Sequence, residues 1–385
     1  MNKEVDLNNL DKGGWQSFTF EQIANKISET VQPSEADVDI YIGLEHIDPN
    51  DIHIRRKGNP SDVRGGKLRC YPGDIIFGKR RAYQRKAAIV DFDGICSAHA
   101  FVFRANQEVI DPNFLPFFLH SDQFMHRMVD ISVGGLSPTI NWNDLKHEEF
   151  LLPPIALQAK FANLLWALDE SSEKNNALKH SLEISYLSLL NSIFEKNISF
   201  TKLKEIKINY FKGLSANEDI TGESMLIPSG GVFPRFLKKE KIKKVNISNE
   251  SSNKKIYQGD ILFNTGGKGT LGRSHFFNIS NGNFYCDTFV LVIRVNDDNF
   301  LNKYIYHVFQ SNFILHQITK HTKGTTGITS IDNDSIENFE IPILKIETQK
   351  QFVKRLDSIE TTIENLNHKI DKEKVLKNSI IKTIF

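Results

Sequence analysis

A long helical stretch occurs twice in this sequence and restricts its architecture more than any other feature. Residues 158–197 and 349–385 align without a gap at a shift of 191 positions. The matched positions include Gln158 and Gln349, Phe161 and Phe352, Leu165 and Leu356, Asn176 and Asn367, and Ile193–Phe194 and Ile384–Phe385. A shift of about half the chain is too long for a solenoid unit. The sequence therefore predicts a duplicated module in which each copy ends in a long helix.

Both copies have the apolar spacing of an amphipathic helix. The positions that carry this spacing are Phe161, Leu164, Leu165 and Leu168 in the first copy and Leu356, Ile359, Ile363, Leu366 and Ile370 in the second. Steps of three and four residues are typical of a coiled-coil seam. Because a lone helix would leave this stripe in water, the two copies are predicted to pack on each other over roughly 55 Å. Two unrelated surface helices are the alternative.

The composition indicates in which cellular compartment the protein works and which residues could give it affinity for DNA. The chain contains 3 cysteines, which form neither a disulfide framework nor a CxxC metal pair. Its start has no apolar signal core, and no apolar run reaches the length of about 18 residues that would indicate a membrane span. We therefore expect a cytoplasmic protein. With a net charge of only +1, contacts with nucleic acid would have to come from local basic patches.

Several framework segments ahead of the helices also recur. The matched segments are YPGDIIF (71–77) and YQGDILF (257–263), CSAHAFVFR (96–104) and CDTFVLVIR (286–294), and NFLPFFLHSDQF (113–124) and NFLNKYIYHVFQSNF (299–313). The first two pairs and IYIGLEHI (40–47) are predicted to be strands, and the third pair a short helix. Together they predict an α+β chain with two tandem strand-rich domains at 1–157 and 198–348, each followed by a long helix at 158–197 and 349–385. A proline, Pro153 or Pro342, precedes each helix. The loops between the matched segments differ, which favours two binding surfaces of different specificity.

No catalytic constellation is evident in the sequence. No GxGxxG fingerprint follows a predicted strand, and no HExxH motif or His/Cys cluster offers a metal site. The segment TGGKGT (265–270) resembles a phosphate-binding loop. However, it lacks the first glycine and the Ser or Thr that would bind the metal. We expect no catalytic and no metal-binding residues in this chain.

The candidate DNA-contacting residues begin in loops that follow the repeated GDIIF/GDILF strand. They are Lys79, Arg80, Arg81, Tyr83, Gln84, Arg85 and Lys86 in loop 78–86, and Thr265, Lys268 and Arg273 in loop 264–273. Arginine can fork onto guanine and glutamine onto adenine, while lysine neutralises phosphate. A solvated charged hairpin is the alternative, but a polar, basic loop at the same place in both halves favours DNA contact.

A second pair of loops, 134–142 and 323–330, precedes the helices and is rich in Gly, Ser and Thr. Its candidate residues are Gly135, Ser137 and Asn141 in the first loop and Lys323, Thr325 and Thr326 in the second. These loops could donate to phosphates or serve only to turn the chain into the helix. Supporting charges are Arg55, Arg56, Lys57 and Arg64 in the first half and Lys238, Lys239, Lys241, Lys243 and Lys244 in the second, although such runs are usually solvated.

The order, doubling and spacing of these segments resemble the specificity subunit of type I restriction–modification enzymes over nearly the whole chain. The resemblance implies two target-recognition domains, each reading one half of a bipartite site in double-stranded DNA, with the helices packed antiparallel as a spacer. It also implies docking of two methylase (modification) subunits, which restriction/translocase subunits then join. S-adenosylmethionine, ATP and Mg would belong to those partners. Because base-reading residues vary within the family, the resemblance transfers loop positions and not base assignments.

The sequence leaves alternatives open for the role of the residues at the helix ends and for the function of the chain. The matched pairs Leu189–Leu190 and Ile380–Ile381 are predicted to contact a methylase partner or to support the helix pair. For the function, a self-contained nuclease or methyltransferase with an unrecognised site is one alternative, which activity of the chain alone would indicate. A coiled-coil scaffold without a DNA role is another, which a salt-dependent shift of DNA would exclude.

Overall fold

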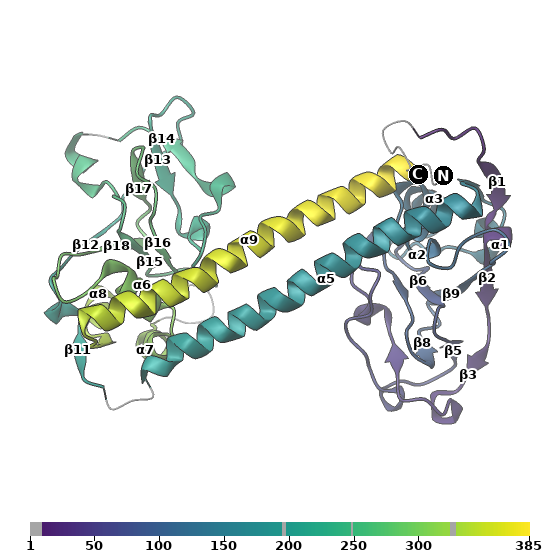
Figure 1. Ribbon diagram of the computed structural model, residues 1–385, viewed down its shortest axis with the longest axis horizontal. Coiled ribbons are helices and arrows are strands. Elements are labelled where there is room, and N and C mark those ends of the chain that lie inside the picture. The colour runs from purple at the N-terminus through teal and green to yellow at the C-terminus, as the bar shows by residue number, and fades with distance from the viewer. Residues whose placement is uncertain (1–9, 195–197, 248, 324–328) are drawn as a thin grey trace. The chain divides into compact units, whose positions relative to one another are not determined.

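The computed structural model describes residues 10–194, 198–247, 249–323 and 329–385 (Figure 1). The chain divides into two compact units, one of residues 1–174 with 370–385 and one of residues 175–369. The two predicted long helices are confirmed as α5 (Ile155–Asn191) and α9 (Ile346–Ile384). Each helix contributes to both units. Among the described helices, none is long and apolar enough to cross a membrane.

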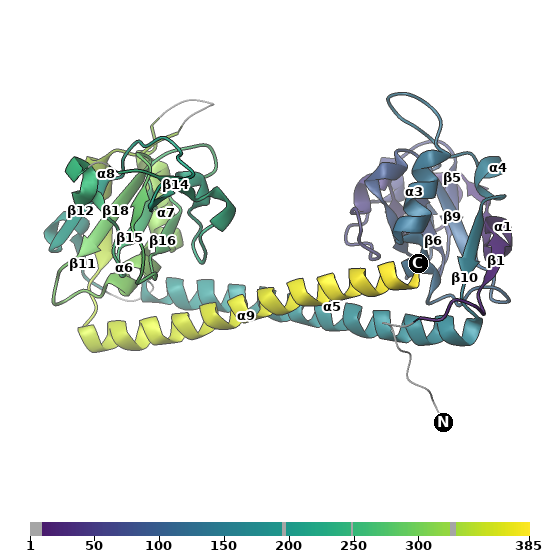
Figure 2. The same ribbon diagram turned by 90° about the horizontal axis from the view of Figure 1, so that it is seen from above.

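The first unit is built on two four-stranded sheets and a two-stranded one (Figure 2). Its strands are β1 (Gln16–Thr19), β2 (Ala24–Ile27), β3 (Thr30–Val31), β4 (Tyr41–Ile42), β5 (Lys67–Cys70), β6 (Ile75–Gly78), β7 (Ala87–Ile89), β8 (Gly94–Cys96), β9 (Ala100–Ala105) and β10 (Glu149–Leu152). Its shorter helices are α1 (Phe20–Ile23), α2 (Leu115–Leu119), α3 (Asp122–Asp130) and α4 (Trp142–Leu145). The sheet orders are β2-β9-β6-β7, β3-β5-β8-β4 and β1-β10, and only the pair β4 and β8 is parallel among the described strand pairs of this unit.

The second unit repeats the main features of this topology, but one of its sheets has three strands where the corresponding sheet of the first unit has four. Its strands are β11 (Phe200–Lys202), β12 (Ile208–Lys212), β13 (Ser224–Ile227), β14 (Lys243–Val245), β15 (Ile261–Asn264), β16 (Ser274–Phe276), β17 (Phe284–Cys286), β18 (Val290–Val295) and β19 (Glu340–Pro342). Its shorter helices are α6 (Asn302–Phe309), α7 (Asn312–His321) and α8 (Asn333–Glu337). The order β12-β18-β15-β16 corresponds to β2-β9-β6-β7, and the parallel pair β13 and β17 corresponds to β4 and β8. The predicted duplication of an α+β unit is thus confirmed.

Two predicted elements differ in detail from the observed ones. The strand expected over 40–47 is paired only at β4, and a 3-10 turn (Leu44–His46) follows it. The helix expected over 113–124 is two helices, because Ser121 caps α3 by accepting a hydrogen bond from the Phe124 amide at 3.2 Å. A serine side chain at this position satisfies an amide that has no partner inside the helix. Ser311 makes the equivalent break between α6 and α7.

The core of each unit is completed by residues from both long helices. In the first unit, Phe161 and Leu165 near the start of α5 are buried together with Ile380, Ile381 and Ile384 from the end of α9. The corresponding residues of the second unit are Phe352 and Leu356 from α9, and Tyr186, Leu190 and Ile193 from α5 and the turn after it.

For the matched pairs at the helix ends, the structure favours structural support over contact with a partner, and one other prediction is corrected. Leu190, Ile380 and Ile381 lie inside the cores of the units, so these side chains are not a surface for a partner. Leu164, predicted on the apolar face, is 39% exposed. The core of the first unit takes its neighbour Leu165 instead, which is fully buried.

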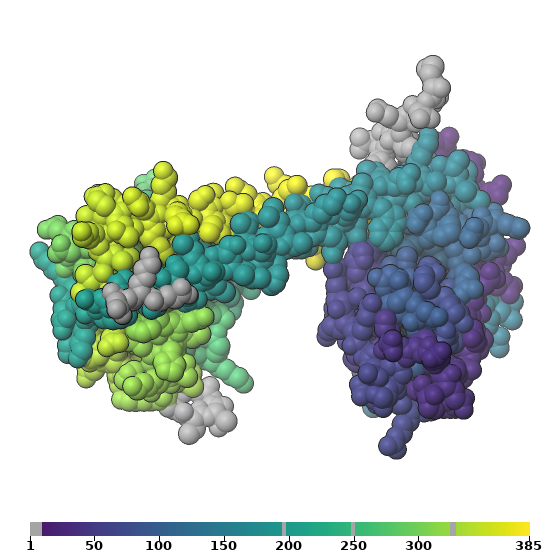
Figure 3. All heavy atoms as spheres, turned by 60° about the horizontal axis from the view of Figure 1, so that its bottom comes forward, coloured from purple at the N-terminus to yellow at the C-terminus, as the bar shows by residue number. Residues whose placement is uncertain are grey.

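The two long helices run in opposite directions along each other. Within the first unit, Lys377 Nζ lies 2.6 Å from Asp169 Oδ1, and Ser171 Oγ lies 2.7 Å from Glu373 Oε1. As the residue number rises along α5, the number of the contacted residue in α9 therefore falls. Ile363 and Leu366 of the predicted seam are buried. The predicted antiparallel pair is confirmed, and within the second unit the atoms of α9 lie beside those of α5 (Figure 3).

A buried glutamine joins the first turn of each long helix to the domain before it. Gln158 and Gln349 are at most 1% exposed, and each makes three hydrogen bonds to backbone groups. The partners are Asp111 N (2.9 Å), Val109 O (3.0 Å) and Pro153 O (2.8 Å) for Gln158, and Leu301 N (2.9 Å), Asn299 O (2.7 Å) and Leu344 O (2.9 Å) for Gln349. These matching bonds explain physically why the two helical repeats begin with glutamine.

The repeated Gly-Asp before β6 and β15 has an equally physical explanation. Asp74 is buried and accepts two hydrogen bonds from Arg104, at 2.7 and 3.0 Å. Asp260 accepts two from Arg294, both at 2.7 Å. Each forked pair satisfies a buried carboxylate and joins the turn before one strand to the end of its neighbour. It thereby supports the strand from which each basic loop emerges.

We predict that Gln158→Leu and Gln349→Leu each lower the free energy of unfolding by about 2–4 kcal/mol, because three buried backbone groups lose their partner. Chemical unfolding of the full chain measures this. Gln351→Leu, on an exposed position of α9, is the matched control and should change stability little. Equal stability of all three variants would contradict the anchoring role.

Candidate nucleic-acid interface

The basic loop after β6 is held in an unusual backbone conformation. Residues 82–84 form a single 3-10 turn, and the residues on either side of it, Arg81 and Arg85, have φ values of 57° and 53°. Residues other than glycine seldom adopt such values, so the surrounding contacts must hold them. Arg80, Arg81 and Tyr83 are exposed, and Tyr83 is 56% accessible. The loop therefore presents two guanidinium groups and one aromatic ring on a fixed backbone.

The second predicted loop of the first unit lies directly against this basic loop. The Arg81 amide donates to Pro138 O at 2.7 Å, and its Nε donates to Ser137 Oγ at 3.0 Å. Arg80 also forms a β-bridge with Thr139. Two loops that the sequence places more than 50 residues apart thus form one surface. The tip of the second loop carries Leu136, which is 97% exposed.

The second unit assembles its two loops in the same way. Gly266 forms a β-bridge with Ser330, and the Gly267 amide donates to Thr329 O at 3.1 Å. Lys323 in turn bridges to Ser330. Thr325 and Thr326 lie outside the described residues. Both units therefore pair the loop after the repeated strand with the loop before the repeated helix.

Several predicted contact residues use their side chains inside the fold instead. Arg85 donates to Asn50 and to the His120 carbonyl, both at 2.8 Å, and Lys86 Nζ donates to Leu44 O at 2.5 Å. Thr265 is buried, and its hydroxyl donates to Phe289 O at 3.0 Å. These three side chains hold the loops in place in this structure. Their contact with DNA stays a prediction.

The other predicted residues keep varying degrees of access. Lys268 and Gly135 are exposed, Gln84 is half-buried, and Lys323 is exposed but paired with Asp332. Lys79 lies 5.1 Å from the centre of the Phe101 ring, and burial, with nearby Lys26, lowers its pKa. Arg273 stacks 4.4 Å over Phe233, and Asn141 donates to Asp144 Oδ2 at 3.2 Å.

The predicted supporting charges of the first half mostly face carboxylates. Arg55 pairs with Asp51 and Glu173, Arg56 with Asp48, and Lys57 with Asp91. Of the lysines in the second half, Lys238 pairs with Glu240 and Lys243 with Glu218, while Lys239, Lys241 and Lys244 are exposed. The positive charge of the first interface is therefore concentrated at Arg80 and Arg81.

Sequence reasoning missed the apolar side chains beside these loops. Besides Leu136, they are Phe289 and Phe236, which are 50% and 55% exposed. The Phe289 ring lies against Gly266, 3.3 Å from where a Cβ atom on that glycine would be. Phe236 stacks on Phe233 with ring centres 4.8 Å apart. Within a sequence, such residues look like parts of core strands. Only their exposure distinguishes them, and an exposed aromatic next to cations is suited to contact a base.

The other chemical candidates in the described chain have ordinary structural roles. The TGGKGT loop leads into β16 and not into a helix, whereas a phosphate-binding loop opens a helix. His307, Asp357 and Glu360 bring potential metal ligands within 4.8 Å of one another. However, His307 already contacts Tyr186 and Asp357, and Lys303 lies 2.9 Å from Asp357. This cluster is a network of satisfied pairs that joins α6 to α5 and α9.

Comparisons with known proteins agree on one family. The model of the type I restriction modification DNA specificity domain matches residues 13–184 and 229–373. Over 176 residues the chain is 28% identical to the type I restriction enzyme EcoDI specificity subunit of Escherichia coli. This match spans 43% of the chain and 38% of that subunit.

Two solved structures share the fold over nearly their whole length. The S subunit of a type I restriction–modification system from M. genitalium has a TM-score of 0.66 and 14% identity, and 99% of each chain is covered. A chain from a structure of a type I R-M system, described for its complex assembly and conformational transition, has a TM-score of 0.55 and 18% identity, with 97% of each chain covered.

The environment of His120, behind the basic loop, predicts a pH dependence. Burial lowers the pKa of His120 from 6.5 to about 4. The hydrogen bond between its Nε2 and Ala87 O, at 2.7 Å, acts to raise that pKa but is outweighed by burial. Between these two pH values the unfolded chain binds a proton that the folded chain rejects, so stability falls as the pH is lowered. Down to pH 5 this contribution amounts to about 2 kcal/mol. In urea unfolding at pH 7 and pH 5, His120→Gln should lose less stability on acidification than the natural chain, while exposed His126→Gln should not differ from it. Equal losses in all three would contradict this assignment.

Proposed function

Because the chain belongs to the type I restriction–modification DNA specificity family, we propose that it recognises a bipartite DNA sequence, with one half-site read by each unit, as a non-catalytic subunit. The observation that supports this proposal most is that, in both units, the loop after the repeated strand contacts the loop before the long helix. A shared scaffold with different loop side chains is what two different half-sites require. Membership in the family accounts for DNA sequence recognition, and the repeated loop pair supports two separate readings.

In the first half-site, Arg80 and Arg81 would supply the charged contacts, and Tyr83 and Leu136 the apolar ones. Arginine can fork onto guanine, and apolar side chains can contact the thymine methyl group. The Gly135 and Ser137 region would approach the phosphates. In the second, Lys268, Arg273 and Lys323 would take these roles. Thr325 and Thr326 lie outside the described residues and stay predicted contacts. This distribution leaves Arg85, Lys86 and Thr265 as residues that hold the loops in place.

We further propose that the chain acts in the cytoplasm with two methylase subunits and with restriction/translocase subunits, and that these partners bind S-adenosylmethionine, ATP and Mg. Exposed apolar side chains on the long helices support docking. They are Leu178, Ile184 and Leu187 of α5, which are 43–56% exposed, and Val375 and Leu376 of α9, which are 69% and 49% exposed. A single exposed apolar residue is ordinary, but a series on two helices suits a protein partner.

The direct test is a genome-wide map of adenine methylation in a host with and without this chain, in the presence of its methylase partner. A bipartite methylated motif should appear only when the chain is present. Binding of the assembled complex to that motif should weaken steeply as salt rises. Methylation or cleavage of DNA by the purified chain alone would instead favour a self-contained enzyme.

Replacing Arg80 and Arg81 with alanine is predicted to weaken specific binding by roughly 1–3 kcal/mol for each side chain that contacts a base. Only discrimination within the first half-site should suffer, and competition binding with each half-site scrambled in turn measures this. Arg127→Ala is the control, because Arg127 is also exposed but pairs with Glu148 outside the loop. Unchanged preference in the double variant would mean that the loop is only a solvated hairpin.

The helices are predicted to set the distance between the half-sites. Four residues inserted after Asn176 and four after Asn367 lengthen each helix by about 6 Å and rotate the residues beyond each insertion by a little over one helical turn. The preferred spacer should then grow by one or two base pairs, while both half-site sequences stay the same. Methylation mapping of the inserted variant gives the answer. Retained activity with the original spacer would leave the helices as docking surfaces only.

A further inference from the structure

Residues 48–56, here called the first bridging segment, lie between β4 and β5 and contact the basic loop on one side. The Asn50 amide donates to Arg85 O at 3.0 Å, and Arg85 Nε donates to Asn50 Oδ1 at 2.8 Å. Asn50 and Arg85 both have positive φ, at 58° and 53°. Since this backbone conformation is uncommon outside glycine, each residue is held in place by these reciprocal hydrogen bonds. The position of the DNA-contacting loop is thus tied to the bridging segment.

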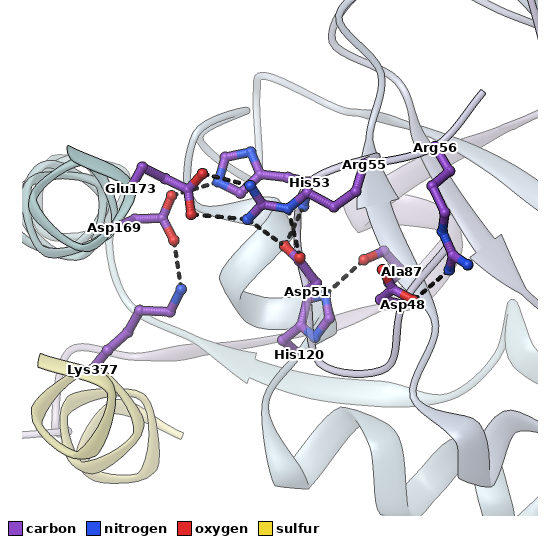
Figure 4. A network of polar contacts seen from close by, with 10 residues as sticks. All are labelled: Asp48, Asp51, His53, Arg55, Arg56, Ala87, His120, Asp169, Glu173 and Lys377. Atoms are coloured by element: carbon purple, nitrogen blue, oxygen red, sulfur yellow. Dashed lines mark hydrogen bonds and ion pairs between the residues drawn. The ribbon is translucent and has the colours of Figure 1, made fainter. Parts of the chain in front are cut away.

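The other side of the first bridging segment contacts the long helices. His53 Nε2 lies 2.6 Å from Asp169 Oδ2, and Arg55 forks onto the two oxygens of Glu173 at 2.5 and 2.9 Å. Asp169 also accepts a hydrogen bond from Lys377 of α9 at 2.6 Å. Figure 4 shows these side chains converging from the segment, from α5 and from α9. One continuous set of polar contacts therefore runs from the helix pair to the basic loop.

The charge states favour this arrangement at neutral pH. Burial acts to raise the pKa of Asp169, but hydrogen bonds from His53 and Lys377 outweigh it and lower that pKa. The hydrogen bond to Asp169 in turn raises the pKa of His53. Asp169 is thus an ionised carboxylate that is only 6% exposed. A buried charge with fixed partners constrains geometry, because moving one partner leaves the other without compensation.

The second unit contains an equivalent segment made of different residues. Residues 232–237, the second bridging segment, follow β13 as the first follows β4. Arg235 lies 3.6 Å from Glu183 of α5 and 3.7 Å from Glu360 of α9, and Phe233 stacks on Arg273 of the basic loop. Glu360 and Asp169 occupy the same position of the helical repeat. An acidic group at one repeat position therefore holds a bridging segment in both units.

We propose that the bridging segments fix each DNA-contacting loop in position relative to the long helices, and that Asp169, Glu173 and Glu360 are positioning residues for target spacing. This inference rests on the proposed function. The long helices contribute to both units, so the position of each loop on them helps to set the distance between the half-sites. Base identity is read by the loops, whereas spacing depends on how firmly the bridging segments hold them. The two properties are therefore separable by mutation.

The experiment uses the full complex and maps methylated targets for Arg55→Ala and Glu173→Gln separately. Each variant removes the forked ion pair from one side, and Glu173→Gln keeps the size of the side chain. Methylation at targets whose spacer differs by one base pair should rise about two- to fivefold, the range expected for a partly exposed ion pair. The preferred bases in both half-sites should stay the same. Arg55→Lys keeps the charge without the fork and should give a smaller rise.

Glu170→Gln is the matched control, because Glu170 lies on the same helix and pairs only with Lys174, one turn away, among the ion pairs of the described residues. It should keep the natural spacing. Strict spacing in both test variants would overturn the proposal, even if the amount of complex falls. Altered base preference in the first half-site with strict spacing would also overturn it, since Arg55 would then act as a reading residue. If the natural chain itself directs no bipartite methylation, the proposed function fails instead.

Discussion

The structure depends on one constraint: neither unit can close its apolar core without both long helices. The start of α5 supplies Phe161 and Leu165 to the first core, and the end of α9 supplies Ile380 and Ile384. Truncating one such buried side chain typically costs about 2–5 kcal/mol, so removing a whole helix end would remove a large part of the stability of a unit. The helices are therefore structural parts of the recognition domains as well as connectors.

This constraint explains which parts of the duplicated sequence stayed alike. Residues that close the cores or satisfy buried backbone groups match between the halves, as Gln158 matches Gln349 and Asp74 matches Asp260. These groups are costly to change, because each buried polar atom needs its partner. Exposed loop side chains such as Arg80 and Lys268 bear no such cost, because the loop backbones are held by a few bridges that do not depend on them. Base specificity can thus differ between the halves on an unchanged scaffold.

Fewer basic side chains are available for DNA contact than the number of basic residues in loop 78–86 suggests. Within loop 78–86, Arg85 and Lys86 point into the fold, whereas Arg80, Arg81 and Tyr83 point outward. The inward pair is needed because a loop with two residues of positive φ must be held by its neighbours. A basic loop after a strand therefore contains both the reading residues and the residues that fix their position, and composition alone does not separate them.

The sequence by itself determined the duplication, the two α+β domains, the two long helices and the pairing of those helices, because apolar periodicity and repeated motifs are local patterns that packing must satisfy. It also located both loops of each candidate interface. Only the tertiary structure decided that these loops touch, that Leu136 and Phe289 are exposed beside them, and that Arg55 serves Glu173 instead of a ligand. These outcomes depend on contacts between residues far apart in the chain, such as Arg55 and Glu173, whose meeting no local pattern encodes.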